Sequence, residues 1–225
     1  GLHELEHLQE ADFGSNQLDT FPALPASMKN LSLRFNNLRS ADDRNMDALA
    51  QLETLNLSSN WFKSVPKAIR NLKSLKTLIM SSNKELSTIP AEIRHLKALE
   101  SVNFHSNAIA KIPRELGSLG NLRTLRLGQN CISEIPKSFA SLLLLRELDL
   151  SRNLLSGFPS PIAGLNSLQV LDLSQNEIQA VPDPLSGLRE LRVLKLAGNH
   201  LSSLPSALQD LVSLQELDVS HNHLK

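Results

Sequence analysis

Asparagine recurs along the chain at a nearly constant spacing, and this spacing is the feature that most constrains the fold. The intervals between successive members are 20, 24, 23 and 24 residues, followed by five intervals of 23. Self-similarity at such a period indicates a chain built from stacked repeat units. The ten positions are Asn16, Asn36, Asn60, Asn83, Asn107, Asn130, Asn153, Asn176, Asn199 and Asn222.

Leucine and proline accompany these asparagines in a fixed pattern. One unit reads Leu148-x-Leu150-x-x-Asn153-x-Leu155 and then Pro159. Proline lies six residues after the asparagine in seven units, and seven residues after it in an eighth. The Leu-x-Leu step has the period of a strand, which places both leucines on one face. The later apolar spacing of three favours a short helical or 3₁₀ return that begins at proline.

This pattern resembles that of the leucine-rich repeat family over essentially the whole chain. The resemblance implies an α/β solenoid, or horseshoe, with a parallel β-sheet on the concave face and short 3₁₀ or helical returns on the convex face. A single unit cannot bury its leucines, whereas units stacked at about 4.8 Å share one sheet and one core. We therefore expect residues 1–225 to form one leucine-rich repeat domain, with about nine full repeats and partial ends.

The asparagines have a structural explanation in this arrangement. Where each strand turns inward, buried backbone N–H and C=O groups need partners, and an amide side chain both donates and accepts. We expect a ladder of asparagines inside the solenoid. Three segments break the period. Residues 21–28 predict an extended return, Ser40 with Asp43 predicts a capped helix that continues to Met46 and Leu49, and residues 84–86 predict a one-residue bulge.

The two ends of the sequence resemble interrupted repeats. Leu2 and Leu5 have the spacing of a return segment, and the chain stops three residues after the last asparagine. We expect a segment of a longer protein whose terminal leucines, including Leu217 and Leu224, are more exposed than those of central repeats. Such a segment would be a monomer or would self-associate weakly through uncapped ends.

Composition and motifs exclude several functions. Lys+Arg and Asp+Glu both total 23, so no basic excess favours nucleic acid, and no apolar run reaches the length of a membrane span. The single cysteine, Cys131, suits a reducing, cytoplasmic location and has no neighbouring base. No catalytic motif occurs, so we expect no enzyme activity and no cofactor. Glu177, His200 and His223 share one position in successive repeats, but solvated side chains explain them better than a functional metal.

The residues between the strand leucines predict the binding surface. Because the leucines are fixed by the core, partner specificity depends on the outward positions of the concave face, which are small and polar and predict an open groove without a deep pocket. The candidate protein-binding residues are Asn56, Ile79, Asn103, His105, Arg126, Asp149, Asp172 and Lys195.

Two interpretations of the charged positions remain open. In the first, Arg126 neighbours Asp149 while Lys195 lies between Asp172 and Asp218, so the column neutralises itself. In the second, Asp149 and Asp172 receive a basic segment of a partner.

Two aromatic residues are candidates for an apolar hot spot beside Ile79. Phe35 and Trp61 lie near the edge of the same face, where exposed aromatics have the composition of a binding hot spot. Alternatively, Trp61 folds over the rim and seals its own repeat.

The predicted function is that of a protein–protein interaction module or signalling scaffold that binds through its concave face. The 23-residue Leu/Ile-Pro repeats are most similar to the intracellular Ras-suppressor type. Two alternatives remain: the substrate-recognition part of a larger enzyme, such as a bacterial effector ubiquitin ligase or a kinase, and a secreted receptor ectodomain.

Overall fold

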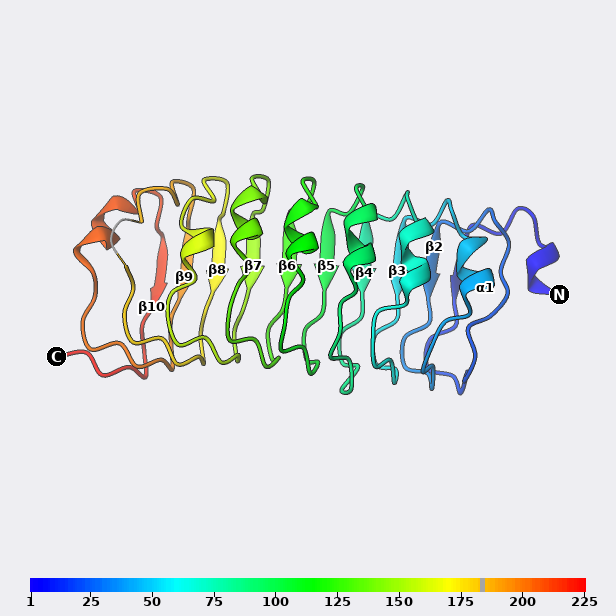
Figure 1. Cartoon of the computed structure of the whole chain (residues 1–225), viewed down its shortest axis with the longest axis horizontal. Coiled ribbons are helices and arrows are strands. Elements are labelled where there is room, and N and C mark those ends of the chain that lie inside the picture. The colour runs from blue at the N-terminus through cyan, green and yellow to red at the C-terminus, as the bar shows by residue number, and fades with distance from the viewer. Residues whose placement is uncertain (183–184) are drawn as a thin grey trace.

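Ten short strands form one parallel sheet in which the order of strands follows the order of the chain (Figure 1). The computed structural model describes residues 1–182 and 185–225. Each strand has three residues, and the N- and C-termini lie at opposite ends of the long axis. The strands are β1 (Glu10–Asp12), β2 (Asn30–Ser32), β3 (Thr54–Asn56), β4 (Thr77–Ile79), β5 (Ser101–Asn103), β6 (Thr124–Arg126), β7 (Glu147–Asp149), β8 (Val170–Asp172), β9 (Val193–Lys195) and β10 (Glu216–Asp218).

The register of the sheet follows the repeat without a slip. Leu31 pairs with Leu55, and Leu78 pairs with Val102, so each strand places its central apolar residue beside that of the next. The repeats of 20 and 24 residues therefore differ from the 23-residue repeats in the segments between strands, and the register of the strands stays the same. The structure confirms the expected leucine-rich solenoid, with its parallel sheet on one side and short returns on the other.

Most returns contain one turn of 3₁₀ helix directly after a proline. Pro66, for example, precedes the helix that buries Ile69. The proline thus lies just before the helix, where its missing N–H costs no hydrogen bond. The 3₁₀ helices are η1 (Leu2–Glu4), η2 (Lys67–Asn71), η3 (Ala91–His95), η4 (Arg114–Ser118), η5 (Lys137–Ser141), η6 (Ser160–Ile162) and η7 (Ser206–Asp210).

Within the described residues, α1 (Asp43–Asp47) is the one α-helix, and it lies where the sequence predicts a helix. Its cap is Asp42, whose Oδ1 accepts a hydrogen bond of 2.8 Å from the Arg44 amide, so the expected cap at Ser40 is wrong. Met46, within the helix, is fully buried and packs in the core. In the described part of the chain, no helix is long and apolar enough to cross a membrane.

The repeat leucines form one continuous core, to which Phe62, Phe104 and Phe139 add fully buried rings. Burial falls at both ends, as expected from the sequence. Leu2 and Leu224 are 41% and 39% exposed, whereas the leucines of central strands are fully buried.

The asparagines form the expected internal ladder. Asn130 is buried, and its Nδ2 donates to the carbonyl oxygens of Leu127 in its own repeat and of Phe104 in the preceding one, both at 3.0 Å. Its Oδ1 accepts from the amide of Ile109 at 3.0 Å. Each such side chain therefore ties two neighbouring repeats together and satisfies backbone groups that water cannot reach.

The residue before each of these asparagines has a left-handed backbone, which the sequence pattern did not predict. In the described part of the chain, nine non-glycine residues with φ between 53° and 59° share this position, and Gly198 holds the tenth place with φ of 66°. The set is Ser15, Phe35, Ser59, Ser82, Ser106, Gln129, Arg152, Gln175 and His221. The solenoid thus accepts local strain once in every repeat to turn the chain away from the strand.

The extra residue at 84–86 changes one step of the ladder. Asn107 Oδ1 accepts from the backbone amide of Asn83 itself at 2.8 Å, and the Leu86 carbonyl accepts from Ala108. Leu86 is fully buried, so the bulge is absorbed without loss of a core position.

Candidate functional site

The outward-pointing residues of the ten strands, with the residues two positions after each strand, form one surface that we call the sheet face. Seven of the eight predicted binding residues occupy the last position of consecutive strands from β3 to β9, and His105 lies two residues after β5. The register places each beside the next, for example Ile79 beside Asn103 and Asp149 beside Asp172. The structure therefore brings all eight together on one face, with seven in one row and His105 beside that row.

The aspartates of this row are partly used by their own backbone. Asp149 Oδ1 accepts from the amide and the hydroxyl of Ser151 at 2.9 and 2.6 Å, and Asp172 does the same with Ser174 at 2.9 and 2.5 Å. These contacts cap the end of each strand. One carboxylate oxygen on each aspartate is thus fixed, and the other remains for further contacts.

The predicted self-neutralising column is wrong in its pairing. Arg126 lies beside Asp149 in the register, yet its guanidinium binds Glu147, with Nε–Oε1 of 2.9 Å, which raises the pKa of Arg126. Lys195 similarly approaches Glu216, with Nζ–Oε1 of 3.7 Å. Both cations reach diagonally to the glutamate at the first position of the next strand. The aspartates that lie directly beside them have shorter side chains and already accept hydrogen bonds from serine.

The two central aspartates consequently differ. Asp149 Oδ2 lies 3.5 Å from His105 Nδ1. Asp172 takes part in no ion pair with any described residue, although it lies between Asp149 and Lys195 in the sheet. Its outer oxygen is the least satisfied charge in the centre of the face.

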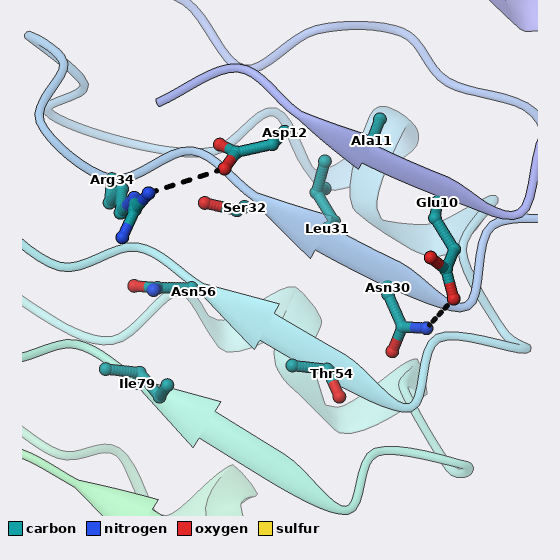
Figure 2. A pocket seen from close by; sticks show the side chains of 10 residues that line it. All are labelled: Glu10, Ala11, Asp12, Asn30, Leu31, Ser32, Arg34, Thr54, Asn56 and Ile79. Carbon is teal, nitrogen blue, oxygen red and sulfur yellow. Dashed lines mark hydrogen bonds and ion pairs between the residues drawn. The ribbon is translucent and has the colours of Figure 1, made fainter. Parts of the chain in front are cut away.

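A hollow of about 460 Å³ opens at the β1–β4 end of the sheet face, where the sequence predicted only an open groove. Figure 2 shows its wall, in which Arg34 Nη2 reaches Asp12 Oδ2 at 3.6 Å and Asn30 donates to Glu10 at 2.7 Å. The lining residues are Glu10, Ala11, Asp12, Asn30, Leu31, Ser32, Arg34, Thr54, Asn56 and Ile79. Of these, only Asn56 and Ile79 are among the binding residues predicted from the sequence.

The hollow has a charged wall and an unpaired hydroxyl. The pKa of Asp12 is lowered mainly by the hydrogen bond that its carboxylate accepts from the Gly14 amide. The nearby Ser32 hydroxyl and the charge of Arg34 lower this pKa further, so the carboxyl stays ionised at neutral pH. Ser32 Oγ is buried near this carboxylate without a hydrogen bond of good geometry to any described atom. The signal in the sequence is the pair of polar outward positions, Asp12 at the end of β1 and Ser32 at the end of β2, which continue the row of candidate residues toward the N-terminus.

Phe35 and Trp61 line a second hollow of about 440 Å³, beside the sheet face in the turns that follow β2 and β3. Their side chains are 56% and 48% exposed. The neighbouring Phe62 is fully buried in the core of that repeat, whereas Trp61 stays about half exposed beside it.

The other candidate groups are dispersed on the surface. The rings of His200 and His223 stack in parallel, with centroids 5.7 Å apart. Among residues 1–182 and 185–225, no three His, Cys, Asp or Glu side chains are placed to hold a metal ion. Cys131 is exposed and free.

Comparison with known proteins agrees with this architecture. A leucine-rich repeat protein of Leptospira interrogans superposes with a TM-score of 0.95 at 33% identity, over the whole of this chain and 57% of its own. The Arabidopsis receptor kinase HAESA, solved with the peptide hormone IDA and the co-receptor SERK1, gives a TM-score of 0.83 at 29% identity, over 98% of this chain and 39% of its own. Human oligodendrocyte-myelin glycoprotein is 34% identical over 84 residues, which is 37% of this chain.

The chain spans about a fifth of the length of the curated relatives it matches, the human and mouse oligodendrocyte-myelin glycoproteins. The family model that matches describes a leucine-rich repeat region and no catalytic fold, and it covers residues 28–134 and 136–225. The chain belongs to the leucine-rich repeat family.

Proposed function

We propose that this protein is a cytoplasmic recognition module or signalling scaffold of the Ras-suppressor type, which binds a partner protein through the sheet face. The observation that carries the proposal is a continuous ten-strand surface whose outward side chains lie outside the buried core and leave polar groups open to a partner. The leucines and asparagines hold the repeats together, whereas Asn103, Asp172 and their neighbours project from the finished scaffold. In solenoids such a surface is the usual place for a partner.

We further propose that the partner brings a basic segment to the centre of this face. Asp172 is half-buried, has one oxygen fixed by Ser174 and keeps the other free of ion pairs with described residues. Within the described residues, the one ion-pair partner of Asp149 is His105, which carries charge only when protonated. An incoming lysine or arginine would therefore gain two partly satisfied carboxylates, and the preorganised carboxylates would lose little entropy on binding.

A peptide-binding extracellular domain is the second candidate. It is favoured by the similarity to HAESA, whose structure contains a bound peptide hormone, over 98% of this chain. The hollow at β1–β4 offers a concave site of a size that suits a side chain or a short peptide. Glycan attached at Asn30 or Asn56, each followed by Leu and Ser, would favour this candidate over the cytoplasmic one.

Photo-crosslinking tests the sheet-face proposal directly. A photoreactive amino acid replaces Ile79 on the sheet face in one variant and Arg70 on the return face in another, and both proteins are exposed to extract from the source organism. We expect a specific adduct from position 79 and none from position 70. The double variant Asp149→Lys with Asp172→Lys should remove that adduct if the partner segment is basic. An adduct from position 70 alone would contradict the proposal.

A further inference from the structure

An exposed aromatic pair lies outside the sheet face and outside the buried core. Phe35 and Trp61 come from successive repeats and line one hollow together with Asn36, Asn37, Ser59, Asn60, Ser82 and Lys84. The core beneath them is already filled by Leu38 and Phe62, both fully buried. We call this hollow, with its two rings, the aromatic edge.

Phe35 has a backbone conformation that a bulky residue rarely adopts. Its φ is 53°, in the left-handed region, where a large side chain is an outlier. The other described repeats fill this place with serine, glutamine, arginine, histidine or glycine. Because the same backbone recurs in every described repeat, it belongs to the solenoid, and what sets this repeat apart is an aromatic residue that is 56% exposed. Exposed aromatic residues of this kind are enriched at binding interfaces.

Both rings are carried on a rigid backbone. The Phe35 amide donates to the Ser58 carbonyl at 3.0 Å, and the Trp61 amide donates to the Leu38 carbonyl at 2.8 Å. Each bond runs to a neighbouring repeat. A ligand that covers the rings therefore does not have to order a flexible loop first, which favours affinity.

The charges around the aromatic edge are predominantly positive. A smaller hollow on the other side of Trp61 is lined by Arg39, Lys63 and Glu85. Lys63 is paired with Glu85 at 3.2 Å, whereas Arg39 and Lys84 form no ion pair with any described residue. One exposed cation, Arg39, therefore lines the smaller hollow beside Trp61, and another, Lys84, lines the aromatic edge.

We propose that the aromatic edge docks an acidic peptide segment of a partner protein. One bulky apolar side chain of this segment packs between Phe35 and Trp61, and flanking Asp or Glu side chains bind Arg39 and Lys84. Exposed aromatics supply apolar contact area at low entropic cost, and the two cations supply complementary charge. This site is separate from the sheet face, so either proposal can fail while the other stands.

Selection from a library of random short peptides displayed on phage tests the proposal. We expect enrichment of sequences in which Asp or Glu flanks Trp, Phe or Leu. A synthetic enriched peptide should change the emission of Trp61, which is the only tryptophan and gives a local signal because tyrosine is absent. Affinity should fall about tenfold or more in Phe35→Ser and in Arg39→Glu with Lys84→Glu.

The variants are chosen to keep the fold intact. Serine occupies the place of Phe35 in other repeats, as at Ser59, so Phe35→Ser should leave the melting temperature unchanged or higher. Leu154→Gln is the matched control, because Leu154 is also 48% exposed and directly follows a ladder asparagine, as Trp61 does. This control should bind the peptide normally.

Three results would overturn the proposal: no enriched peptide, enriched peptides that are basic, or equal binding by wild type and Phe35→Ser. A fourth concerns nucleic acid, because single-stranded bases also stack on aromatic rings. Polyuridine RNA that binds with the same dependence on Phe35, Arg39 and Lys84, and more tightly than any acidic peptide, would assign the aromatic edge to RNA instead.

Discussion

His105 and Asp149 approach each other across an intervening repeat, with Nδ1 and Oδ2 3.5 Å apart. His105 follows β5 and Asp149 ends β7, and β6 lies between these strands. Gly128, which follows β6, lies between the two side chains. A Cβ built on this glycine would lie 2.8 Å from His105 Nδ1 and 2.6 Å from Asp149 Oδ2. The missing side chain is therefore what allows the two groups to meet.

Gly128→Ser should separate this pair while leaving the fold in place. Serine is compatible with this position, since Ser151 and Ser174 hold it in the next two repeats. The new Cβ would meet the partly exposed His105 ring and Asp149 carboxylate, including the Oδ1 that Ser151 holds, so we expect a stability loss of about 1 kcal/mol. A crystal structure of the variant should show the Nδ1–Oδ2 distance lengthened. An unchanged distance would mean that the glycine is not required.

The asparagine ladder should contribute strongly to stability in the middle of the solenoid. Asn130→Ala leaves the buried Ile109 amide without its acceptor. It also removes one of two amide donors to each of the Phe104 and Leu127 carbonyls, which keep Asn107 and Asn153 as donors. We expect the free energy of unfolding to fall by about 1–3 kcal/mol. Chemical denaturation measures this difference.

Asn16→Ala is the matched control for the ladder. Asn16 is exposed, and the described acceptors of its side-chain amide are the Phe13 and Gly14 carbonyls of its own repeat. Water can replace these contacts, so the loss should be clearly smaller than for Asn130. Equal losses of unfolding free energy in the two variants would show that the contribution of a ladder asparagine does not depend on its burial.

The sequence predicted the fold well because one period dictates both burial and pairing. A residue such as Leu148 can be buried only if its repeat stacks on the next one, and this requirement fixes the order and register of the strands. The left-handed residue before each ladder asparagine was missed because it carries no shared residue type. Glycine, which favours a left-handed backbone, occupies this position once, as Gly198. The other repeats have serine, glutamine or other residues there, so no shared residue type marks the position.

The candidate site was predicted less completely, for a physical reason. The repeat places Arg126 beside Asp149, but the length of the arginine side chain lets it choose Glu147 instead. The residues that lie side by side in the sheet register are therefore not always the ones that form ion pairs. The hollow at β1–β4 depends on how Arg34 and Asp12 fold toward each other, which no spacing rule describes.

Gly198→Ala should destabilise the protein, unlike the same change at Gly120. Gly198 has φ of 66°, and a Cβ there would overlap the Gln175 amide, so we expect a loss of about 1 kcal/mol. A Cβ on Gly120 meets no atom, and alanine restricts the unfolded chain, so stability should rise slightly. Thermal melting of both variants measures the contrast, and similar shifts would contradict the role of the left-handed backbone.

Acid should weaken the last strand through Asp218. Hydrogen bonds from the Ser220 hydroxyl and amide lower the pKa of Asp218 below its ordinary value of 3.8. The unfolded state then takes up a proton more readily than the folded state. The resulting stabilisation is fully present above the ordinary pKa and is lost as pH falls through the lowered value.

Asp218→Asn tests this pH dependence without removing the hydrogen-bond acceptor. Asn56 and Asn103 already accept the same backbone contact at the ends of their strands. We expect denaturation between about pH 5 and about pH 2 to show a smaller loss of stability in the variant than in wild type. Equal losses would exclude Asp218 as a contributor.

Ionic quenchers should report the positive charge around the aromatic edge. Trp61 is about half exposed, so acrylamide should quench its emission readily. Arg39 and Lys63 line the hollow next to it, and Lys84 lines the other, so iodide should quench more strongly than caesium at the same ionic strength. Arg39→Glu with Lys84→Glu should reverse this order because the local charge changes sign. Equal quenching by both ions in wild type would show that the cations do not act on the tryptophan, and the charge complementarity with an acidic segment would then have no basis.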